Sequence, residues 1–219
     1  MPFGNPSSKH TEGREARDAL EGARSRCASA LGVPAGDIYF TSGATESNAL
    51  VIHSLFFSRF LKTAGDKTLI LISAIEHPSV GENAARLERL GARIGRIGCE
   101  EDGRVTVKTL GKALEKYPGA RFAAIMAVNN ETGSVMDMPA LAALLRSRKG
   151  PPVHLHCDMV QAAGKIPVNL RAWDADSASL SAHKIGGPRG TGLLYLRRPL
   201  DPVYAGGGQE GGVRPGTEN

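Results

Sequence analysis

Only three cysteines occur among the 219 residues of this sequence. Cys27, Cys99 and Cys157 show neither metal-ligand spacing nor an even framework for disulfides, which is typical of proteins in a reducing compartment. His154 and His156 alternate with apolar residues in a strand-like run, where a hydrogen-bonded strand histidine is the simpler interpretation than a metal ligand. No apolar run approaches the length of a membrane span, and the first residues form no signal-peptide pattern. We therefore expect a cytoplasmic protein without a membrane partner.

Aromatic residues are also scarce, at 5% of the chain, whereas glycine is plentiful with 27 residues. This balance is typical of an alanine-rich α/β enzyme core rather than of a β-sandwich. The formal net charge is +5, but the basic residues are scattered and alternate with acids, as at Arg14-Glu15. We interpret them as a solvated surface and not as a nucleic-acid interface. Binding of an anionic ligand stays compatible with this charge.

Strands and helices alternate along the chain. The apolar patterns predict helices over 13–31, 42–60, 79–90, 109–116 and 139–147. They predict strands over 37–41, 68–73, 93–97, 104–107, 121–128, 153–158, 177–181 and 193–196. This alternation, without an internal repeat, predicts an α/β fold with a mostly parallel, mixed sheet and helices on both faces.

Short motifs with polar side chains that could bind a ligand follow four of the predicted strands at their carboxyl ends. They contain Ala44 and Thr45, then His77, then Asn130, and finally Asp158 with Gln161. Because ligands of open α/β sheets bind at that edge, the convergence predicts a ligand site, and a helix start at 42–48 suits a phosphate. Each motif also has a purely structural interpretation: a helix cap at Thr45, His77 or Asp158, and a turn at 129–133.

A lysine follows the predicted strand that ends at Ser181. Burial at the lip of a strand would lower the pKa of the Lys184 ammonium, and a neutral amine forms a Schiff base with an aldehyde. Ser181 and His183 flank this lysine and would hold an anion, while the glycines that follow let the backbone approach a bound group. The alternative is a surface hairpin whose lysine is solvated.

Six motifs occur in one order along the chain: Thr-Ser-Gly-Ala-Thr-Glu-Ser-Asn (41–48), Glu-His-Pro (76–78), Val-Asn-Asn-Glu-Thr-Gly (128–133), His-Cys-Asp-Met-Val-Gln (156–161), Ser-Ala-His-Lys-Ile-Gly-Gly-Pro-Arg-Gly (181–190) and Gly-Gly-Gly-Gln-Glu with Arg-Pro-Gly-Thr (206–217). As a set they closely resemble the cysteine desulfurases of the class V aminotransferase group, which are fold-type I pyridoxal-phosphate enzymes. The resemblance extends over nearly the whole chain.

The resemblance implies that the chain binds pyridoxal phosphate in the large domain of that architecture. It further implies removal of sulfur from L-cysteine, which leaves L-alanine, and transfer of the sulfur as a persulfide to an iron–sulfur scaffold or another acceptor. It assigns roles residue by residue: Lys184 holds the cofactor and moves a proton, Asp158 pairs with the pyridinium nitrogen, His77 stacks on the ring, Asn130 and Gln161 lie at its hydroxyl and substrate side, and Ala44, Thr45, Ser181 and His183 take the phosphate. Thr217 would reach the phosphate of the partner subunit in a homodimer.

In that family a smaller C-terminal domain carries the loop with the catalytic cysteine and an arginine for the substrate carboxylate. None of the three cysteines here lies in a matching motif. The resemblance thus implies that residues 1–219 form an incomplete large domain without the small domain, with little or no desulfurase activity alone. Two alternatives stay open: another pyridoxal-phosphate reaction, such as that of a selenocysteine lyase or an aminotransferase, and a non-catalytic remnant.

Overall fold

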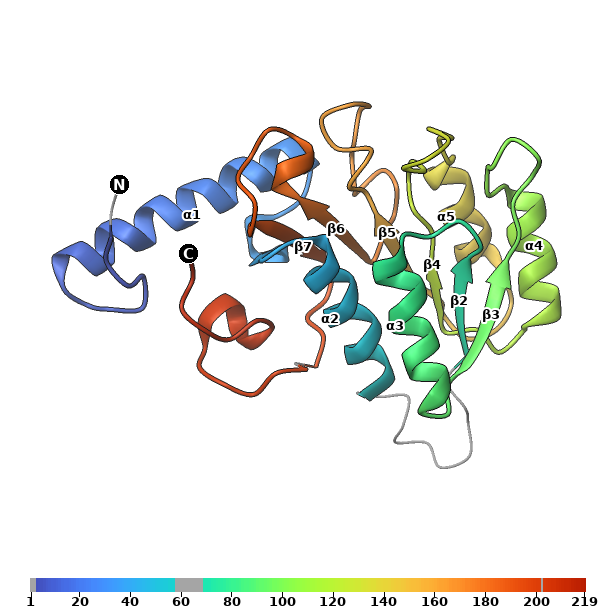
Figure 1. Ribbon diagram of the computed structural model, residues 1–219, viewed down its shortest axis with the longest axis horizontal. Helices are drawn as coiled ribbons and strands as arrows, with labels where there is room; N and C mark the ends of the chain where they lie inside the picture. Colours follow the sequence, from blue (N-terminus) through green and yellow to red (C-terminus); the bar gives the residue numbers. More distant parts are fainter. Residues whose placement is uncertain (1–2, 58–68, 202) are drawn as a thin grey trace.

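A seven-stranded mixed sheet forms the centre of the molecule (Figure 1). The computed structural model describes residues 3–57, 69–201 and 203–219 of the chain. Its strands are β1 (Ile38–Thr41), β2 (Leu69–Ser73), β3 (Arg93–Ile97), β4 (Phe122–Ala124), β5 (His154–Asp158), β6 (Ser177–Ser181) and β7 (Gly192–Leu196), in the order β1-β7-β6-β5-β4-β2-β3. Strands β3, β2, β4, β5 and β6 pair in parallel, and β7 is antiparallel to both of its neighbours.

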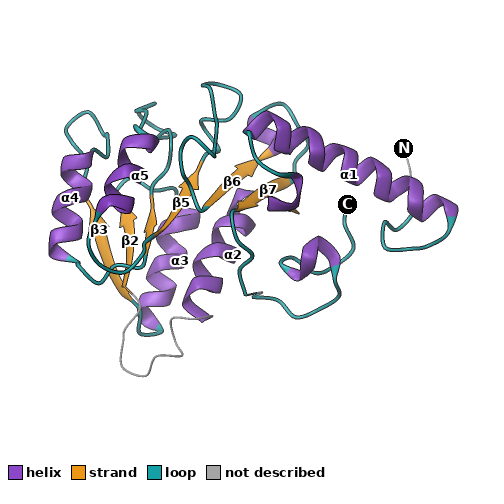
Figure 2. Ribbon diagram, turned by 180° about the vertical axis from the view of Figure 1, so that it is seen from behind, coloured by secondary structure: helices purple, strands orange, loops and turns teal. Residues whose placement is uncertain are grey.

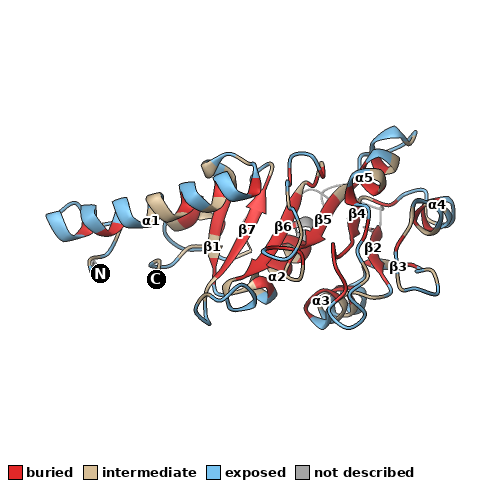
Figure 3. Ribbon diagram, turned by 90° about the horizontal axis from the view of Figure 1, so that it is seen from above, coloured by how far each residue is buried: buried red, intermediate tan, exposed pale blue. Residues whose placement is uncertain are grey.

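Helices cover both faces of this sheet. They are α1 (Thr11–Leu31), α2 (Ala44–Phe57), α3 (Pro78–Arg89), α4 (Val107–Lys116) and α5 (Met138–Ser147), with short 3₁₀ segments η1 (Ala35–Asp37), η2 (Ala182–Lys184) and η3 (Gln209–Gly212). Seen from above, α2 and α3 lie on one side of the strands, and α1, α5 and α4 lie on the other (Figure 3). The predicted α/β fold, with a mostly parallel sheet between two helical layers, is confirmed.

Alternation along each strand divides the apolar side chains between two cores. In β2, Leu69 and Leu71 face the core that α4 and α5 cover, whereas Ile70 and Ile72 face the core under α2 and α3. All four side chains are buried. A strand covered on both faces needs an unbroken apolar run, which explains why this segment reads as continuous hydrophobic sequence. Each such side chain contributes about 2 kcal/mol through burial.

Two predicted elements differ from the structure, and two extend beyond the described residues. The predicted strand 104–107 is wrong, because Val107 already starts α4 and Thr106 caps it. The Thr106 side chain accepts a hydrogen bond from the Thr109 amide while the Thr109 side chain accepts one from the Thr106 amide, and this reciprocal cap favours helix over strand. Strand β4 ends at Ala124, earlier than the predicted 128, although the backbone continues beside β5. Residues 58–60 of the predicted helix and Thr68 of the predicted strand lie outside the described residues.

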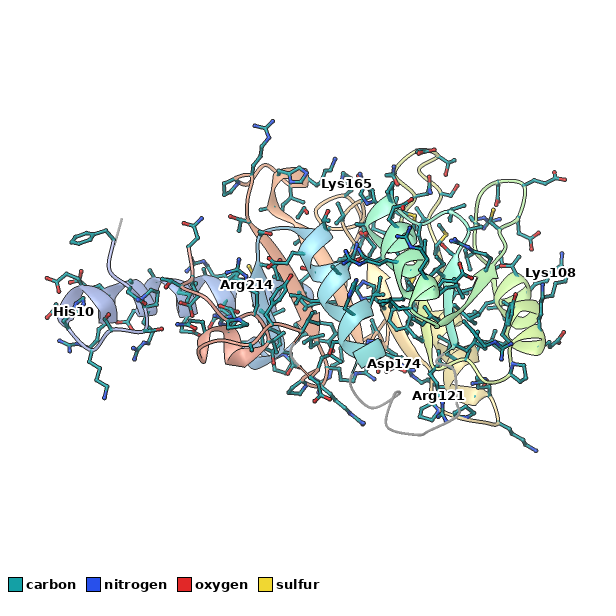
Figure 4. All side chains as sticks on the ribbon, turned by 60° about the horizontal axis from the view of Figure 1, so that its bottom comes forward. His10, Lys108, Arg121, Lys165, Asp174 and Arg214 are labelled. Atoms are coloured by element: carbon teal, nitrogen blue, oxygen red, sulfur yellow. The ribbon has the colours of Figure 1, made fainter. Side chains whose placement is uncertain are left out.

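Helix α1 extends past the β1 edge of the sheet, and both chain ends lie on that side (Figure 1). Gly32, at φ 70°, ends this helix in the left-handed conformation that glycine adopts without strain. His10 and Lys108 mark opposite ends of the molecule (Figure 4). None of the helices in the described part of the chain has the length and apolarity that a membrane span requires.

Candidate active site

The carboxyl ends of the parallel strands meet at one edge of the sheet, where the connecting loops gather (Figure 2). The edge brings together β6 and the start of α2, because the Ala44 amide donates to Ser181 Oγ at 2.8 Å. It also brings α2 to β5, because Asn48 Nδ2 donates to Asp158 Oδ2 at 3.0 Å. Ala44 and Asp158, two members of the predicted convergence, therefore lie at one edge of the sheet together with Ser181.

The first turn of α2 is held close to the sheet. A Cβ atom on Gly192 would lie 2.3 Å from the Gly43 Cα, so only glycine at the start of β7 admits the turn that precedes the helix. Ser47 Oγ meets Thr41 Oγ1 at 2.8 Å and donates to the Leu193 carbonyl at 3.2 Å. The positive end of the helix dipole therefore points at the edge, which suits an anion. Thr45 is exposed there.

Asp158, the last residue of β5, carries the most enclosed carboxylate of the predicted set. Its residue is 5% exposed, and it accepts hydrogen bonds from Asn48 Nδ2 and, at 3.1 Å, from the Val160 amide. Burial raises the pKa of Asp158, while these two hydrogen bonds and the nearby His77 act in the opposite direction. A buried carboxylate with neutral donors only is suited to a cationic partner.

His77 lies at the same edge and caps α3. Its Nδ1 accepts from the Ser79 amide at 3.1 Å and lies 2.8 Å from Ser79 Oγ. The interpretation of His77 as a helix cap is thus confirmed, and the cap leaves the other ring nitrogen outside these contacts.

Lys184 and His183 lie in η2, directly after β6, and both are exposed. The expected burial of Lys184 is wrong: β6 ends at Ser181, and the chain turns outward into the 3₁₀ segment. Among the described residues, neither side chain forms a hydrogen bond or an ion pair. The glycine turn that follows is confirmed, since Gly186 and Gly190 have φ of 82° and 75°.

Three further predicted residues lie apart from this cluster of contacts. Asn130 is exposed, and its neighbour Asn129 forms the turn by accepting from the Glu131 and Thr132 amides. Gln161 accepts from Lys165 Nζ at 3.0 Å. Thr217 is exposed in the C-terminal segment, which runs beside α1 (Figure 1). The next two residues, Glu218 and Asn219, line a pocket with Ser42 and Thr191, and the role of Thr217 toward a partner subunit stays a prediction.

Sequence reasoning missed the residues that hold this edge from beneath. Glu76 accepts from Ser73 Oγ and, at 2.7 Å, from the Met126 amide, while its Oε2 is buried and has no hydrogen-bond partner among the residues that the structure describes. Burial, with a smaller contribution from the Asp158 charge, raises the pKa of Glu76 to about 7. His156 could have been found from the sequence, because residues two apart in a strand lie on the same face of the sheet and His156 is two residues before Asp158. Its ring bonds to Ser177 and Asn48, so the interpretation of a satisfied strand histidine is confirmed.

The sequence model of the family described as aminotransferase class-V matches residues 2–214. The chain belongs to this family. A curated class-V relative, the cysteine desulfurase of Enterobacter agglomerans, is 42% identical over 220 residues, which cover 99% of this chain and 52% of the relative. The chain spans about half the length of the curated relatives it matches. The resemblance of the six motifs to cysteine desulfurases is thus confirmed.

Solved structures agree with this assignment to the class-V family. A NifS-like protein superposes with a TM-score of 0.92 at 35% identity, covering 100% of this chain and 59% of its own. A structure described as SspA in complex with cysteine superposes with a TM-score of 0.90 at 32% identity, covering 99% of this chain and 61% of its own. The mixed seven-stranded sheet is therefore the fold-type I architecture of this family.

Class-V aminotransferases and cysteine desulfurases are pyridoxal-phosphate enzymes, and the donor set of this edge fits that cofactor in kind. The start of α2 with Ser181 suits the phosphate, the enclosed Asp158 carboxylate suits a cationic ring nitrogen, and Lys184 supplies a primary amine at the end of β6. Elsewhere, a cavity of about 700 Å³ lies between α1 and η3 and is lined by residues that include Arg24 and Glu210. That cavity lies on the α1 side of the molecule, not at the carboxyl edge.

Proposed function

We propose that this chain binds pyridoxal phosphate at the carboxyl edge of its sheet and serves as the cofactor-binding large domain of a cysteine desulfurase. One observation carries the proposal: in a class-V chain, the enclosed Asp158 carboxylate lies on the same edge as the start of α2. We assign residues 1–219 to that large domain, since the chain spans about half the length of the curated relatives it matches.

In this proposal the residues of the edge divide the work. Ala44, Thr45, Ser181 and His183 bind the phosphate, Asp158 keeps a proton on the ring nitrogen, and His77, Asn130 and Gln161 orient the ring and the substrate. Lys184 holds the cofactor through its amine and afterwards accepts and returns a proton at Nζ. Pyridoxal phosphate supplies the electron sink that stabilises negative charge on the substrate carbon. Thr217 completes the phosphate site of a partner subunit, so we propose a homodimer.

The proposed substrate is L-cysteine, which gives L-alanine and a sulfur that passes to an iron–sulfur scaffold or another acceptor in the cytoplasm. The similarity to a structure described as a complex with cysteine supports this substrate. In this proposal Cys157 does not supply the persulfide. Cys157 is buried, and burial raises the pKa of its thiol well above the ordinary value, which disfavours the reactive thiolate.

The same cysteine chemistry favours one alternative within the class-V family. A reaction that needs no protein thiol, such as that of a selenocysteine lyase or an aminotransferase, would use the same edge. Adding L-cysteine, selenocysteine or another amino acid and recording the spectrum of the bound cofactor distinguishes these substrates.

Reductive trapping of the cofactor tests the proposal. The chain is incubated with pyridoxal phosphate, treated with sodium borohydride, which fixes the aldehyde covalently onto the lysine that holds it, and mapped by peptide mass spectrometry. We expect label in the Lys184 peptide alone, lost in Lys184→Ala and retained in Lys165→Ala, a matched control for an exposed lysine near the same edge (Figure 4). Absence of label, or label scattered over many lysines, contradicts cofactor binding at this site.

A further inference from the structure

A strip of polar side chains interrupts the apolar face of the sheet beneath α2. Alternate residues of β5 and β6 form it: His154, His156, Asp158, Ser177, Ser179 and Ser181. On the same face, β2 and β7 present isoleucine and leucine instead. Buried polar groups at this density are stable only when each has a hydrogen-bond partner. The strip therefore requires a network. Helix α2 contributes to it the Ala44 amide, which donates to Ser181, and the side chain of Asn48, which is 0% exposed.

The orientation of the Asn48 amide follows from Asp158. A carboxylate accepts hydrogen bonds only, so the Asn48 atom 3.0 Å from Asp158 Oδ2 is its NH₂ group. The second hydrogen of this group goes to Ser79 Oγ at 2.8 Å. The amide oxygen then faces His156 Nε2 at 2.9 Å and accepts from it. All the hydrogen-bonding groups of this one buried amide are used.

The first branch of the network runs back along the sheet. Since His156 donates from Nε2, its Nδ1 accepts, and Ser177 Oγ donates to it at 2.7 Å. The Ser177 oxygen in turn accepts from His154 Nε2 at 2.7 Å. This pattern needs neutral rings, and burial lowers the pKa of His156 to about 3 and that of His154 to about 4. In every hydrogen bond of this branch, the donor is the residue farther from Asp158 along the chain of contacts and the acceptor is the nearer one.

The second branch runs to the helix cap. The Ser79 hydroxyl accepts from Asn48, so its own hydrogen points to His77 Nδ1 at 2.8 Å. The Ser79 amide donates to the same nitrogen at 3.1 Å. With two donors on Nδ1, the neutral ring carries its hydrogen on Nε2, the nitrogen outside the network. Both branches thus end on lone pairs of residues at the candidate active site.

We propose that Asn48 is a positioning residue which acts on two active-site residues at once: it orients the Asp158 carboxylate, and through the Ser79 hydroxyl it reinforces the Nε2–H form of His77, which the Ser79 amide also favours. The inference rests on the proposed function and deepens it. Asp158 oriented by Asn48 stays available to a cationic ring nitrogen, and His77 presents a hydrogen-bond donor rather than an acceptor. One amide thus couples the residue that would pair with the ring nitrogen, Asp158, to the residue that would stack on the ring, His77.

Nuclear magnetic resonance of the histidine rings, in ¹⁵N-labelled chain without cofactor, tests the inference independently of cofactor binding. We expect Nε2–H for both His77 and His156 in the wild type. In Asn48→Ala we expect His77 to populate both tautomers, and in Ser79→Ala we expect the change at His77 only. Asn83→Ala, which removes another amide between α2 and α3 that donates to the Ser79 carbonyl, is the control and leaves both rings unchanged.

The outcomes separate the two proposals. An Nδ1–H form of His77 in the wild type, or an unchanged His77 spectrum in folded Asn48→Ala and Ser79→Ala, overturns the role of Asn48. If Asn48→Ala does not fold, Ser79→Ala alone decides, because it keeps the Asn48–Asp158 contact. A second measurement is the Kd for pyridoxal phosphate. It should rise about tenfold in Asn48→Ala, because Asp158 loses its hydrogen bond from Asn48. If the wild type binds no pyridoxal phosphate, the proposed function fails while the tautomers still decide this inference.

Discussion

The carboxyl of Glu76 is unusual because its Oε2 atom is buried and has no hydrogen-bond partner in the described part of the chain. Its other oxygen accepts from Ser73 Oγ and from the Met126 amide, which ties the end of β2 to the backbone after β4. An ionised carboxylate here lacks compensation at Oε2, and burial raises its pKa to about 7. Glu76 therefore binds a proton in the folded chain at a pH where the unfolded chain has released it.

We expect the stability of the chain to reflect this proton. Between pH 4.5, the ordinary pKa of the group, and pH 7, only the folded state keeps the proton, so rising pH favours unfolding. The contribution lost over that window is up to about 3 kcal/mol. Urea unfolding of wild type and Glu76→Gln at several pH values measures this contribution. As the pH rises, the free energy of unfolding of the variant should increase relative to that of the wild type. Glu82→Gln, at an exposed position on α3, is the control. Parallel curves for wild type and Glu76→Gln would contradict the assignment.

The types of residue at the site were predictable from the sequence, but their partners were not. Asp158 and His77 stand directly after strand-like runs, and strand polarity puts them at one edge. Asn48 contacts Asp158 from 110 residues away, and no periodicity within α2 or β5 reports which polar atoms meet. The exposure of Lys184 was missed for a related reason, since the sequence does not show where β6 stops pairing and the chain turns outward.

Helix α5 is joined to the amino edge of the sheet by Arg146. This side chain donates to the Val153 carbonyl at 2.9 Å and to the Asp174 carbonyl at 2.7 Å, and it pairs with the carboxylates of Asp174 and Asp176 at 2.8 Å. Asp174 lies at that edge, opposite the one near Lys165 (Figure 4). Its φ of 49° is a left-handed conformation that needs such support in a residue other than glycine.

Removing this side chain should destabilise the chain by about 2 kcal/mol, because Arg146→Ala leaves the Val153 and Asp174 carbonyls without this donor. The carboxylates of Asp174 and Asp176 lose one of their partners but keep Arg197. The side chain is 31% exposed, so the charge pairs are partly screened and the loss should shrink in 1 M NaCl without vanishing. Urea unfolding at low and high salt measures both effects. Lys149→Ala, at an exposed residue just beyond α5, should change stability by less than about 0.5 kcal/mol. An equal effect of the two variants would contradict this role.

The predicted elements were accurate where apolar periodicity is strong and wrong where a cap decides. Strand β2 and helix α1 lie within two residues of the predicted bounds. The segment 104–107 contains valine and threonine, which favour strands, yet the reciprocal cap of Thr106 and Thr109 starts α4 there. Hydrogen-bond geometry of this kind overrides a propensity of a few tenths of a kcal/mol.

The two ends of the described chain are joined by one buried ion pair. Arg24 of α1 binds Glu210 of η3 through two hydrogen bonds of 2.7 and 2.8 Å, although the two residues are 186 positions apart. Arg24 also donates to the Ile38 carbonyl, and Glu210 accepts from the Phe40 amide at 2.7 Å, so the pair is joined to the backbone of β1. The side chains of Arg24 and Glu210 are 10% and 1% exposed. Glu210 itself is held at φ 46°, a strained conformation for a residue with a side chain.

We expect this pair to hold the segment 203–219 against α1 and β1. Glu210→Ala leaves the buried Arg24 guanidinium with only the half-exposed Glu21 as its ionic partner and the Phe40 amide without its acceptor, which should cost about 3 kcal/mol. Hydrogen exchange of peptides from 203–219 should accelerate in the same variant, since the segment loses its buried anchor. The matched control is Arg214→Ala: Arg214 pairs with Glu46 at 3.2 Å from the same segment but is 27% exposed, so its loss should cost less than about 1 kcal/mol.

The double variant Arg24→Ala/Glu210→Ala separates the pair from the two side chains taken singly. Removing Glu210 alone takes this partner from the buried charge of Arg24, whereas removing both residues takes the charge away as well. The double variant should therefore be destabilised by clearly less than the sum of the single variants. The difference, measured by urea unfolding, is the coupling energy, and we expect it to exceed about 1 kcal/mol. Additive single effects would mean that Arg24 and Glu210 act independently. In that case the C-terminal segment would be held by its apolar contact through Val213, which packs in the core beneath α2 and α3.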